Sequence, residues 1–350
     1  MPDSSSPVPS HIEHILGAAR IAPSQNNMQP WRFLVEGETV SFLVDHERDR
    51  SPANADGRIA RIAVGASIEC ALLRAGRMGD TVRFLPPRAN ALLTLSITGP
   101  KRVPEPDKAL VRRSTNRRLY DGRPLDEASF RWLTEATAPL DATRTHWFGR
   151  ERVRIVGPIV EAGDALFYED AGLREAALRA VHFDVRDREE VTHGQSVGSL
   201  ELSAPERLVF ESLRHGPQER LAAMGSFQKM GARARRLMES ASGVCVITTQ
   251  GSEPASDVAA GRCMQRAWLA LTRRGLVAQP MMSIPALEAA HGGLADSERS
   301  AAVVASLAAS FPSVERGARV AVLMRVGWAT PPTSIVRRLP LEESVAVAST

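Results

Sequence analysis

Apolar residues in the first part of the chain recur at two different spacings. A recurrence every three or four residues predicts a helix, and alternation with polar residues predicts a strand. The elements expected on this basis are a helix over 11–21 with Ser10 as its N-cap, two strands over 31–44 around a turn at Glu36-Gly37, a helix over 57–79 that ends at Gly79, and an apolar strand over 91–99. Residues 1–9 are rich in Ser and Pro, and we expect them to be disordered.

A similar order of elements follows in the rest of the chain. The pattern predicts a helix over 126–137 capped by Asp126, a strand over 145–156, a long polar and helical region to about residue 240, a buried strand over 242–249, a helix over 256–275 that ends at Gly275, and a buried strand over 318–329. We expect an α+β fold in which helices flank mixed sheets.

The repeated order indicates an internal duplication. Two sets of positions match at one common offset each: Pro23 and Trp31 with Pro139 and Trp147, and Gly65, Ile68, Ala71, Leu73 and Gly79 with Gly261, Met264, Ala267, Leu269 and Gly275. Chance similarity between amphipathic helices is the alternative. We predict a first repeat over 10–105 and a second over 106–350, with an insertion at about 160–230 that the first repeat lacks.

Composition excludes several classes of function. The chain has 350 residues, of which 43% are hydrophobic, and a net charge of only +4 without a concentrated basic tract, so a nucleic-acid partner is not expected. No apolar run approaches the ~20 residues that span a bilayer, and the N-terminus lacks a signal-peptide pattern. We therefore expect a cytoplasmic protein without membrane contact.

Motifs for metals and nucleophiles are also missing. The three cysteines have no metal-ligand spacing, and their odd number argues against a disulfide framework; Cys245, in an apolar run, is expected in the core. There is no P-loop, no GxGxxG and no nucleophile elbow. We assign no metal site and no catalytic side chain.

The stretch 23–31, PSQNNMQPW, carries unusually many hydrogen-bonding side chains for a turn. Ser24, Gln25, Asn27 and Gln29 provide donors and acceptors, while Trp31 can anchor the segment in the core. Such a set suits the edge of a planar heterocycle or a sugar-like chain.

Two basic segments could complement this loop. Residues 112–118 read RRSTNRR, and Arg337-Arg338 follow the last predicted strand. Guanidinium groups bind phosphate oxygens through paired charge-assisted hydrogen bonds. A solvated charge run on a linker is the alternative, and the segments alone do not decide between the two.

Taken in order, these motifs resemble the nitroreductase superfamily of FMN-dependent proteins, and the length resembles its long branch of mycobacterial Acg-type proteins, in which two repeats in one chain imitate the family's dimer. The resemblance implies one FMN and a cofactor site made of Ser24, Gln25 and Asn27, of Arg112, Arg113, Ser114 and Arg117, of Gln279, Pro280, Met281, Met282 and Ser283, and of Arg337 and Arg338. Many nitroreductases have Glu-Gly where this chain has Met282-Ser283, which puts ordinary NAD(P)H handling in question.

The resemblance also implies an uneven division of the site. The first repeat has the Asn loop and the second has the Arg-Arg-Ser segment and the closing Arg pair, whereas the second repeat reads PLDATRTHW where its own Asn loop would stand. One complete set of parts implies one FMN per chain, a decayed second site, and a chain that can function as a monomer.

The function implied is an FMN-dependent oxidoreductase that moves a hydride through flavin N5 to or from a small organic substrate. An FMN-storing protein with little turnover, and a flavin oxidase or dehydrogenase that tailors a natural product, are the alternatives. In Acg-type relatives a segment in the position of the insertion covers the flavin as a lid. Tyr168, His182 and His193 lie in it, and each is expected to be a packing or surface residue, with His193 the best candidate for a proton donor.

Overall fold

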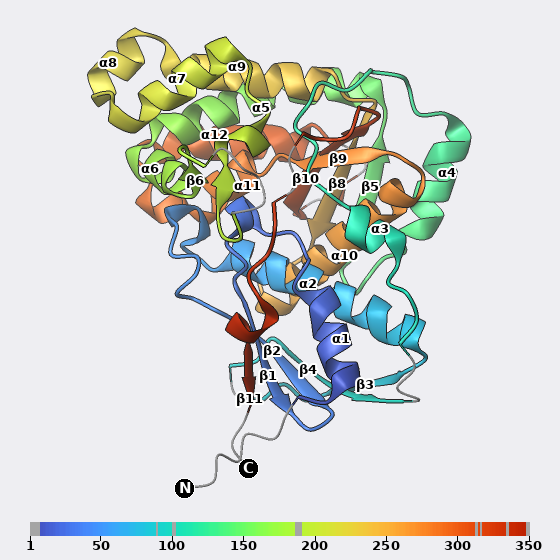
Figure 1. The fold of residues 1–350 in the computed structure, drawn as a ribbon. Helices are drawn as coiled ribbons and strands as arrows, with labels where there is room; N and C mark the ends of the chain where they lie inside the picture. Colours follow the sequence, from blue (N-terminus) through green and yellow to red (C-terminus); the bar gives the residue numbers. More distant parts are fainter. Residues whose placement is uncertain are drawn as a thin grey trace, which may run out of the picture.

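The structure of the chain is a computed structural model that describes residues 8–88, 90–99, 103–185, 191–311, 314–315, 317–333 and 336–347. It combines helices with a mixed sheet and an antiparallel sheet, so the expected α+β class is confirmed (Figure 1). Most of the N-terminal segment expected to be disordered, residues 1–7, lies outside the described residues.

The first sheet occupies the narrow lower end of the molecule in Figure 1. Its strand order is β11-β1-β2-β4-β3. The strands are β1 (Trp31–Glu36), β2 (Thr39–Val44), β3 (Thr81–Leu85), β4 (Leu93–Thr98) and β11 (Val345–Val347). Neighbours pair antiparallel except β11, which comes from the far end of the chain and joins β1 in parallel.

The second sheet lies in the wider upper part and has the order β5-β8-β10-β9, with all neighbours antiparallel. Its strands are β5 (Thr143–Phe148), β8 (Gly243–Thr249), β9 (Val277–Pro280) and β10 (Arg319–Gly327). This is the order β1-β2-β4-β3 of the first sheet, element for element. A separate short pair, β6 (Val181–His182) and β7 (Gln195–Ser196), is parallel.

Helices separate and cover the two sheets. They are α1 (Ser10–Ala19), α2 (Arg58–Met78), α3 (Lys108–Arg112), α4 (Glu127–Ala136), α5 (Arg150–Glu169), α6 (Ala171–Arg179), α7 (Ala204–His215), α8 (Gln218–Ala223), α9 (Ser226–Glu239), α10 (Pro254–Arg273), α11 (Ser283–Ala289) and α12 (Ser297–Ala309). α2 packs on the first sheet and on α10, and α10 packs on the second sheet, so this pair lies between the sheets. α5 and α9 pack together on the outer side of the second sheet.

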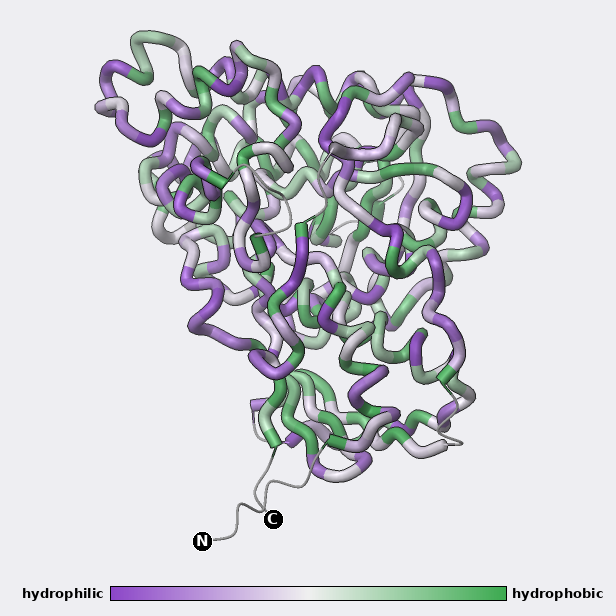
Figure 2. Tube along the Cα trace, in the orientation of Figure 1, coloured by the Kyte–Doolittle hydropathy of each residue, from purple (hydrophilic) through white to green (hydrophobic). Residues whose placement is uncertain are grey.

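The core follows these layers. The largest buried cluster joins α1, α2 and α10 to the inner faces of both sheets, and a second cluster lies between the second sheet and α5, α9 and α12. Along β8, Cys245 and Ile247 face the first cluster while Val244 and Val246 face the second. Buried strands therefore appear as continuous hydrophobic segments in Figure 2, because both of their faces are covered.

The crossing of α2 and α10 depends on two glycines. A Cβ on Gly65 would lie 2.2 Å from the carbonyl oxygen of Val258, and one on Gly261 would lie 1.9 Å from that of Ile62. Ile62 and Gly65 stand 196 residues before Val258 and Gly261. The two contacts therefore involve equivalent positions of the two repeats, at the offset seen in the sequence. Such a self-complementary contact is the geometry of a two-fold axis.

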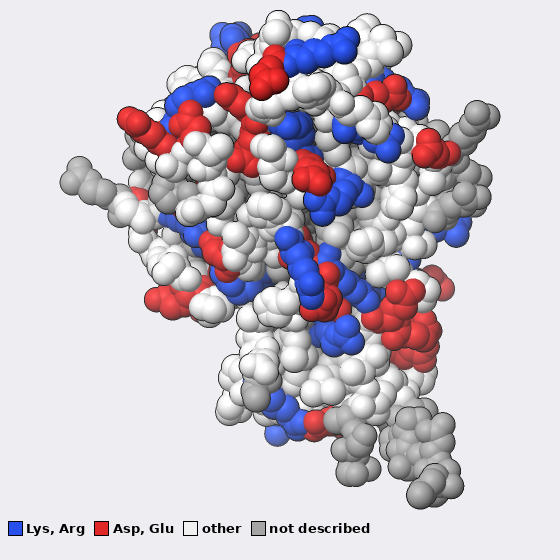
Figure 3. Space-filling model, turned by 90° about the vertical axis from the view of Figure 1, so that its left-hand side faces the viewer, with Lys and Arg blue, Asp and Glu red and all other residues white. Residues whose placement is uncertain are grey.

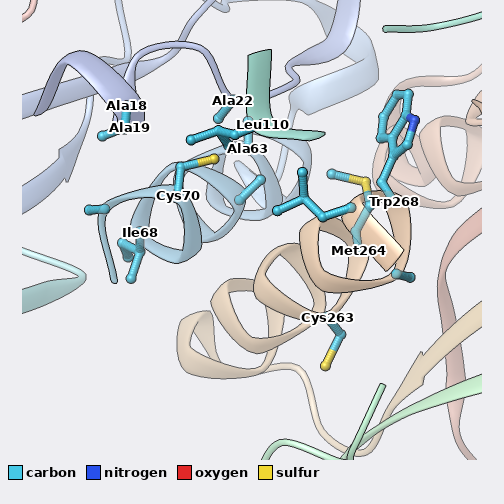
Figure 4. Close-up of a cluster of buried hydrophobic side chains, with 14 of the residues drawn as sticks. Ala18, Ala19, Ala22, Ala63, Ile68, Cys70, Leu110, Cys263, Met264 and Trp268 are labelled. Carbon is cyan, nitrogen blue, oxygen red and sulfur yellow. The ribbon is translucent and has the colours of Figure 1, made fainter. Parts of the chain in front are cut away.

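Figure 4 shows on which sides of the α2–α10 pair the side chains near the crossing lie. Ala63 of α2 and Met264 and Trp268 of α10 lie along the upper side of the helix pair, whereas Cys263 points to the opposite side. The upper side is the one that forms the wall of a cavity described below.

Several expectations about elements are confirmed and others are wrong. Gly79, with a φ of 79°, ends α2, and the Asp126 side chain caps α4 by accepting a hydrogen bond from the Ser129 N–H at 2.8 Å. The N-cap of α1 is Pro9, and Ser10 makes no capping bond. The strand expected over 145–156 stops at Phe148, because Val153, Val156 and Val160 continue a helical stripe in α5.

Candidate functional site

A cavity of about 570 Å³ lies where three distant parts of the chain meet. The loop after α1, the segment after α3 and the stretch that follows β10 all contribute to its wall. The lining residues are Arg20, Ile21, Pro23, Ser24, Asn27, Leu110, Val111, Arg113, Ser114, Thr115, Arg117, Thr192, Gln195, Val336, Arg337, Arg338 and Pro340. Both basic segments and the Asn loop singled out in the sequence therefore reach one site.

The loop after α1 is fixed in a conformation that exposes amide groups to the cavity. Asn26, Asn27 and Gln29 have left-handed φ values of 49°, 59° and 54°, which asparagine tolerates better than most residues. Ser24 Oγ accepts a hydrogen bond from the Gln29 N–H at 2.9 Å. Trp31 is fully buried, as expected for the anchor of the loop.

Two amide oxygens of this loop are buried without a hydrogen-bond partner among the described residues: Oδ1 of Asn27 and Oε1 of Gln25. The other end of the Asn27 amide is satisfied, since its Nδ2 donates to the carbonyl oxygens of Thr192 and Arg337, both at 3.0 Å. An unpartnered buried acceptor lowers the stability of the fold by about 1–3 kcal/mol, so a bound molecule with hydrogen-bond donors would be favoured here.

The basic end of the cavity concentrates positive charge. Arg20 donates to the Leu339 carbonyl, Arg113 to the Ile21 carbonyl and Arg338 to the Ala22 carbonyl, at 2.8, 3.0 and 2.9 Å. No carboxylate forms an ion pair with any of the three within the described part of the chain. Burial lowers the pKa of Arg113 to about 10 and that of Arg338 to about 9, and the neighbouring Arg113 lowers the pKa of Arg338 further.

Charge gathered in this way without a counter-ion favours an anion, because each buried cation costs several kcal/mol unless it is paired. Nε of Arg113 also lacks a partner among the described residues, and its guanidinium lies 4.6 Å from the ring centre of Trp268. Figure 3 shows basic side chains across the middle of one face, where the wide and narrow parts of the molecule meet.

A buried arginine positions the segment after α3. The Arg325 side chain, fully buried on β10, donates to the carbonyl oxygens of Asn116 and Arg118 at 3.2 and 2.7 Å and to Oε1 of Gln279 at 2.8 Å. Thr115 forms a parallel bridge with Ala278 of β9, so the segment runs along the sheet edge. Sequence reasoning missed Arg325; the available signal was a charge within the apolar run 320–329.

A second cavity of about 210 Å³ adjoins the first, and a larger share of its lining residues is apolar. Ile59, Ile62 and Ala63 of α2 face Met264 and Trp268 of α10 across it. Pro280, Met282 and Ser283 also line it. A third cavity of about 160 Å³ continues from there and is lined in part by Gln279 and Met281.

Residues 191–200 of the insertion, called the strap below, reach the wall of these cavities through Thr192 and Gln195. Thr192 accepts hydrogen bonds from the side chains of Asn27 and Gln29, the latter at 2.8 Å, and the Gln195 side chain donates to Asn26 Oδ1 at 3.2 Å. Arg117 donates to Gln195 Oε1 at 2.9 Å and to the Ser199 carbonyl at 3.1 Å. The strap thus lies against the Asn loop and joins it to the Arg segment.

The structure brings together most of the predicted site residues. Those that line the first or second cavity are Ser24, Gln25, Asn27, Arg113, Ser114, Arg117, Pro280, Met282, Ser283, Arg337 and Arg338. Arg112 is exposed at the end of α3 and lines neither. Of the three insertion residues considered, Tyr168 lines the second and third cavities. The pKa of His193 is lowered, first by burial and then by the nearby charge of Arg48. The His182 ring contacts the His193 carbonyl oxygen at 2.9 Å.

The residues present fit an FMN. The cluster of Arg20, Arg113 and Arg338 matches a terminal phosphate, and the unpartnered oxygens of Gln25 and Asn27 match hydroxyl or ring N–H donors. The apolar second cavity between α2 and α10 suits a planar ring. Within the described residues no group of three or more His, Cys, Asp or Glu side chains could hold a metal ion, and no described helix is both long and apolar enough to cross a bilayer.

Comparison with known proteins gives distant structural likenesses only. No family model matches the chain, and no curated protein matches it. An FMN- and NADPH-dependent nitroreductase NfnB from Sphigopyxis sp. strain HMH resembles it with a TM-score of 0.40 and 18% identity, over 69% of this chain and 98% of that one. NfnB from Mycobacterium smegmatis, in complex with NADPH, gives 0.39 and 18% over 69% and 99%.

A nitroreductase with bound FMN from Bacteroides fragilis NCTC 9343 gives a TM-score of 0.37 and 11% identity, over 69% of this chain and 100% of that one. These solved structures are nitroreductase-type FMN proteins by their descriptions. At such scores and identities the likeness assigns neither a family nor an activity to this chain, whose chemistry must be argued from its own residues.

Proposed function

We propose that this chain is an FMN-dependent oxidoreductase of the nitroreductase type with one cofactor site shared by its two halves. The observation that supports this most directly is the cluster of Arg20, Arg113 and Arg338, which has no carboxylate partner among the described residues and adjoins the unpartnered Asn27 oxygen. Charge and acceptors in this order match a phosphate at one end of a ligand and hydrogen-bond donors further along it.

Each part of the chain has a role in this proposal. Arg113 and Arg338 bind the phosphate, Gln25 and Asn27 accept hydrogen bonds from the polar chain or ring edge, and Met264 with Trp268 packs against the ring. When bound, FMN supplies hydride transfer at N5.

We further propose that the two halves arose by duplication and that the second site has decayed. The shared strand order and the equivalent contacts at Gly65 and Gly261 support the duplication. In the second half, Leu140 and Thr143 close a tight turn where an Asn loop would be needed. The expected stoichiometry is one FMN per chain, and a monomer would contain the complete site.

Turnover depends on the strap. Its contacts with Asn27 and Gln29 support a position beside the proposed flavin, where it would act as a lid, and this favours FMN storage as the second candidate function. If the strap covers the flavin, NAD(P)H should reduce it slowly, whereas dithionite should reduce it at once. Stopped-flow absorbance of the flavin under anaerobic conditions measures both rates. Reduction by NADPH as fast as by dithionite would exclude the lid and with it the storage function.

The cofactor proposal is tested by titration of the protein with FMN and with FAD. We expect saturation at one FMN per chain and a preference over FAD. Arg113→Met should weaken FMN binding about ten- to a hundred-fold, the cost of a lost bond to a charged group.

Arg112→Met is the matched control, because it removes the adjacent guanidinium, which lines neither cavity. Its affinity for FMN should stay close to that of the unmodified protein. A protein that ignores FMN would refute the proposal, and equal losses in the two variants would refute the assignment of the phosphate to Arg113.

A further inference from the structure

The third cavity, of about 160 Å³, is lined by Arg117 of the predicted cofactor set and by three ionisable side chains outside that set. Asp164 and Tyr168 come from successive turns of α5, Arg233 from α9, and Arg117 from the segment after α3. The third cavity shares Arg117, Tyr168, Gln195, Met282 and Ser283 with the second, so the two are direct neighbours.

The stripe on α5 explains how a carboxyl group reaches this place. Val156, Val160, Asp164 and Tyr168 follow one another at intervals of four residues, and the first two are buried in the core. The helix face that packs on the second sheet therefore runs into the cavity. Asp164 occupies a position where the pattern would otherwise place an apolar residue.

A close approach of α5 and α11 fixes the carboxyl group. A Cβ on Gly163 would lie 2.4 Å from Cγ1 of Ile284, so only a glycine lets the two helices come this near. The approach brings Ser283 to the carboxyl group, and its Oγ donates to Oδ1 of Asp164. No arginine or lysine forms an ion pair with Asp164 within the described residues.

Three other ionisable side chains line the third cavity with Asp164: Tyr168, Arg233 and Arg117. Tyr168 lies on the same helix as Asp164, and Arg233 carries a partner, since its Nε lies 3.5 Å from Oε1 of Glu206 and it donates to the Leu200 carbonyl. Arg117 is tied to the strap. Burial raises the pKa of Asp164 to about 6, while the Ser283 hydrogen bond and Arg233 lower it; burial also raises the pKa of Tyr168, so its hydroxyl stays protonated.

We propose that the third cavity receives a small neutral acceptor and that Asp164 donates the proton that completes its reduction. Ser283 is the positioning residue for the carboxyl group, and Arg233 adds positive charge near it. The walls carry both signs of charge in a small space, which suits a compact polar molecule better than an ion. This proposal rests on the proposed flavin function.

The step balances in atoms and charge. The acceptor gains a hydride from the reduced flavin, and its protonation breaks the O–H bond of Asp164. The product leaves as the two-electron-reduced neutral compound, and the carboxylate takes up a proton from solvent before the next cycle. Tyr168, four residues further along α5, can donate a hydrogen bond to the acceptor without losing its proton.

The test compares two oxidants of the reduced, FMN-loaded protein. Hydroquinone formation from 1,4-benzoquinone requires protons, whereas ferricyanide takes electrons alone. In stopped-flow measurements Asp164→Asn should slow reoxidation by benzoquinone about 10²-fold, the lower end of the contribution of a general acid. Reoxidation by ferricyanide should not change. The rate with benzoquinone should fall as the pH rises through about 6 in the unmodified protein, because the donor form is lost, and should not do so in Asp164→Asn.

Glu161→Gln is the control on the same helix, because Glu161 pairs with Arg235 at the surface at 3.0 Å. It should behave like the unmodified protein with both oxidants. Infrared spectra of the resting protein give an independent readout: the C=O band of a protonated carboxyl should titrate near pH 6 and be absent in Asp164→Asn. Ser283→Ala should move that midpoint upward, because it removes a bond that favours the ionised form.

Unchanged benzoquinone kinetics in Asp164→Asn would overturn the proposal, and so would equal slowing with both oxidants, which indicates a structural role. If Asp164→Asn does not fold, an unshifted midpoint in Ser283→Ala overturns it equally. Normal FMN binding and ferricyanide reoxidation in the unmodified protein would leave the flavin function standing in each of these cases.

Discussion

Because α2 and α10 are in close contact at Gly65, we expect that adding one methyl group there lowers the stability of the protein strongly. In Gly65→Ala the new Cβ would lie 2.2 Å from the carbonyl oxygen of Val258, about 1.2 Å short of the 3.4 Å at which ordinary contact begins. The obstructing atoms are backbone, so no side-chain rotation relieves the overlap. Overpacking typically costs 1–3 kcal/mol, and we expect a loss of about 3 kcal/mol in the free energy of unfolding.

The same helix provides the matched control. A Cβ on Gly76 would meet nothing within 4 Å, and Gly76→Ala should therefore stabilise the protein by about 0.5–1 kcal/mol through the better helix propensity of Ala. Urea unfolding followed by circular dichroism measures both variants. Because α2 and α10 line the second cavity, Gly65→Ala should also weaken FMN binding. Equal unfolding midpoints for the two variants would refute the close contact and the two-fold arrangement built on it.

Three further predictions concern single side chains. Asp164→Asn should raise the free energy of unfolding at pH 7 by up to about 3 kcal/mol. The pKa of Asp164 is about 6 in the folded state against 3.8 ordinarily, so the unmodified protein loses stability as the pH rises through this window. Urea titrations should show that the difference in stability between the two proteins vanishes below pH 3.8. Arg325→Met should destabilise by about 3 kcal/mol in urea, because it leaves buried carbonyl groups unpaired; a loss below 1 kcal/mol would contradict this. Glu201 directly follows the strap, and Glu201→Gln weakens its bonds with Thr333, so FMN should dissociate several-fold faster in stopped-flow fluorescence; Glu211→Gln, which removes an ion pair with Arg207 within α7, is the control.

Local patterns in the sequence were sufficient where one segment determines its own structure. Trp31, Gly79 and Asp126 each act within a few residues of their position, as an anchor, a helix end and a cap, and each was predicted correctly. The strand over 145–156 failed because the alternation in RVRIV is too short to distinguish a strand from a helix. Packing of Val153 and Val156 in the second core cluster favours the helix.

Features created by distant segments could not be predicted in this way. Arg113 and Arg112 are neighbours in one motif, and only the end of α3 decides that one side chain enters the cavity while the other faces solvent. Asp164 depends on Gly163 and Ser283, which stand 120 residues apart in the sequence. No periodicity within either segment carries that information.

The division of the site between distant parts of the chain links stability to binding. Asn27 comes from the half that contains the first sheet, Arg113 from the beginning of the second half, and Arg338 from the segment just before β11 returns to the first sheet. Each group has one end tied to another part of the chain, as when Asn27 donates to the carbonyl oxygens of Thr192 and Arg337. A ligand that satisfies the remaining ends joins both sheets, the strap and the C-terminal segment at once. Binding should therefore stabilise the whole chain rather than one half, because a ligand that binds only the assembled site shifts the unfolding equilibrium of every part that forms it.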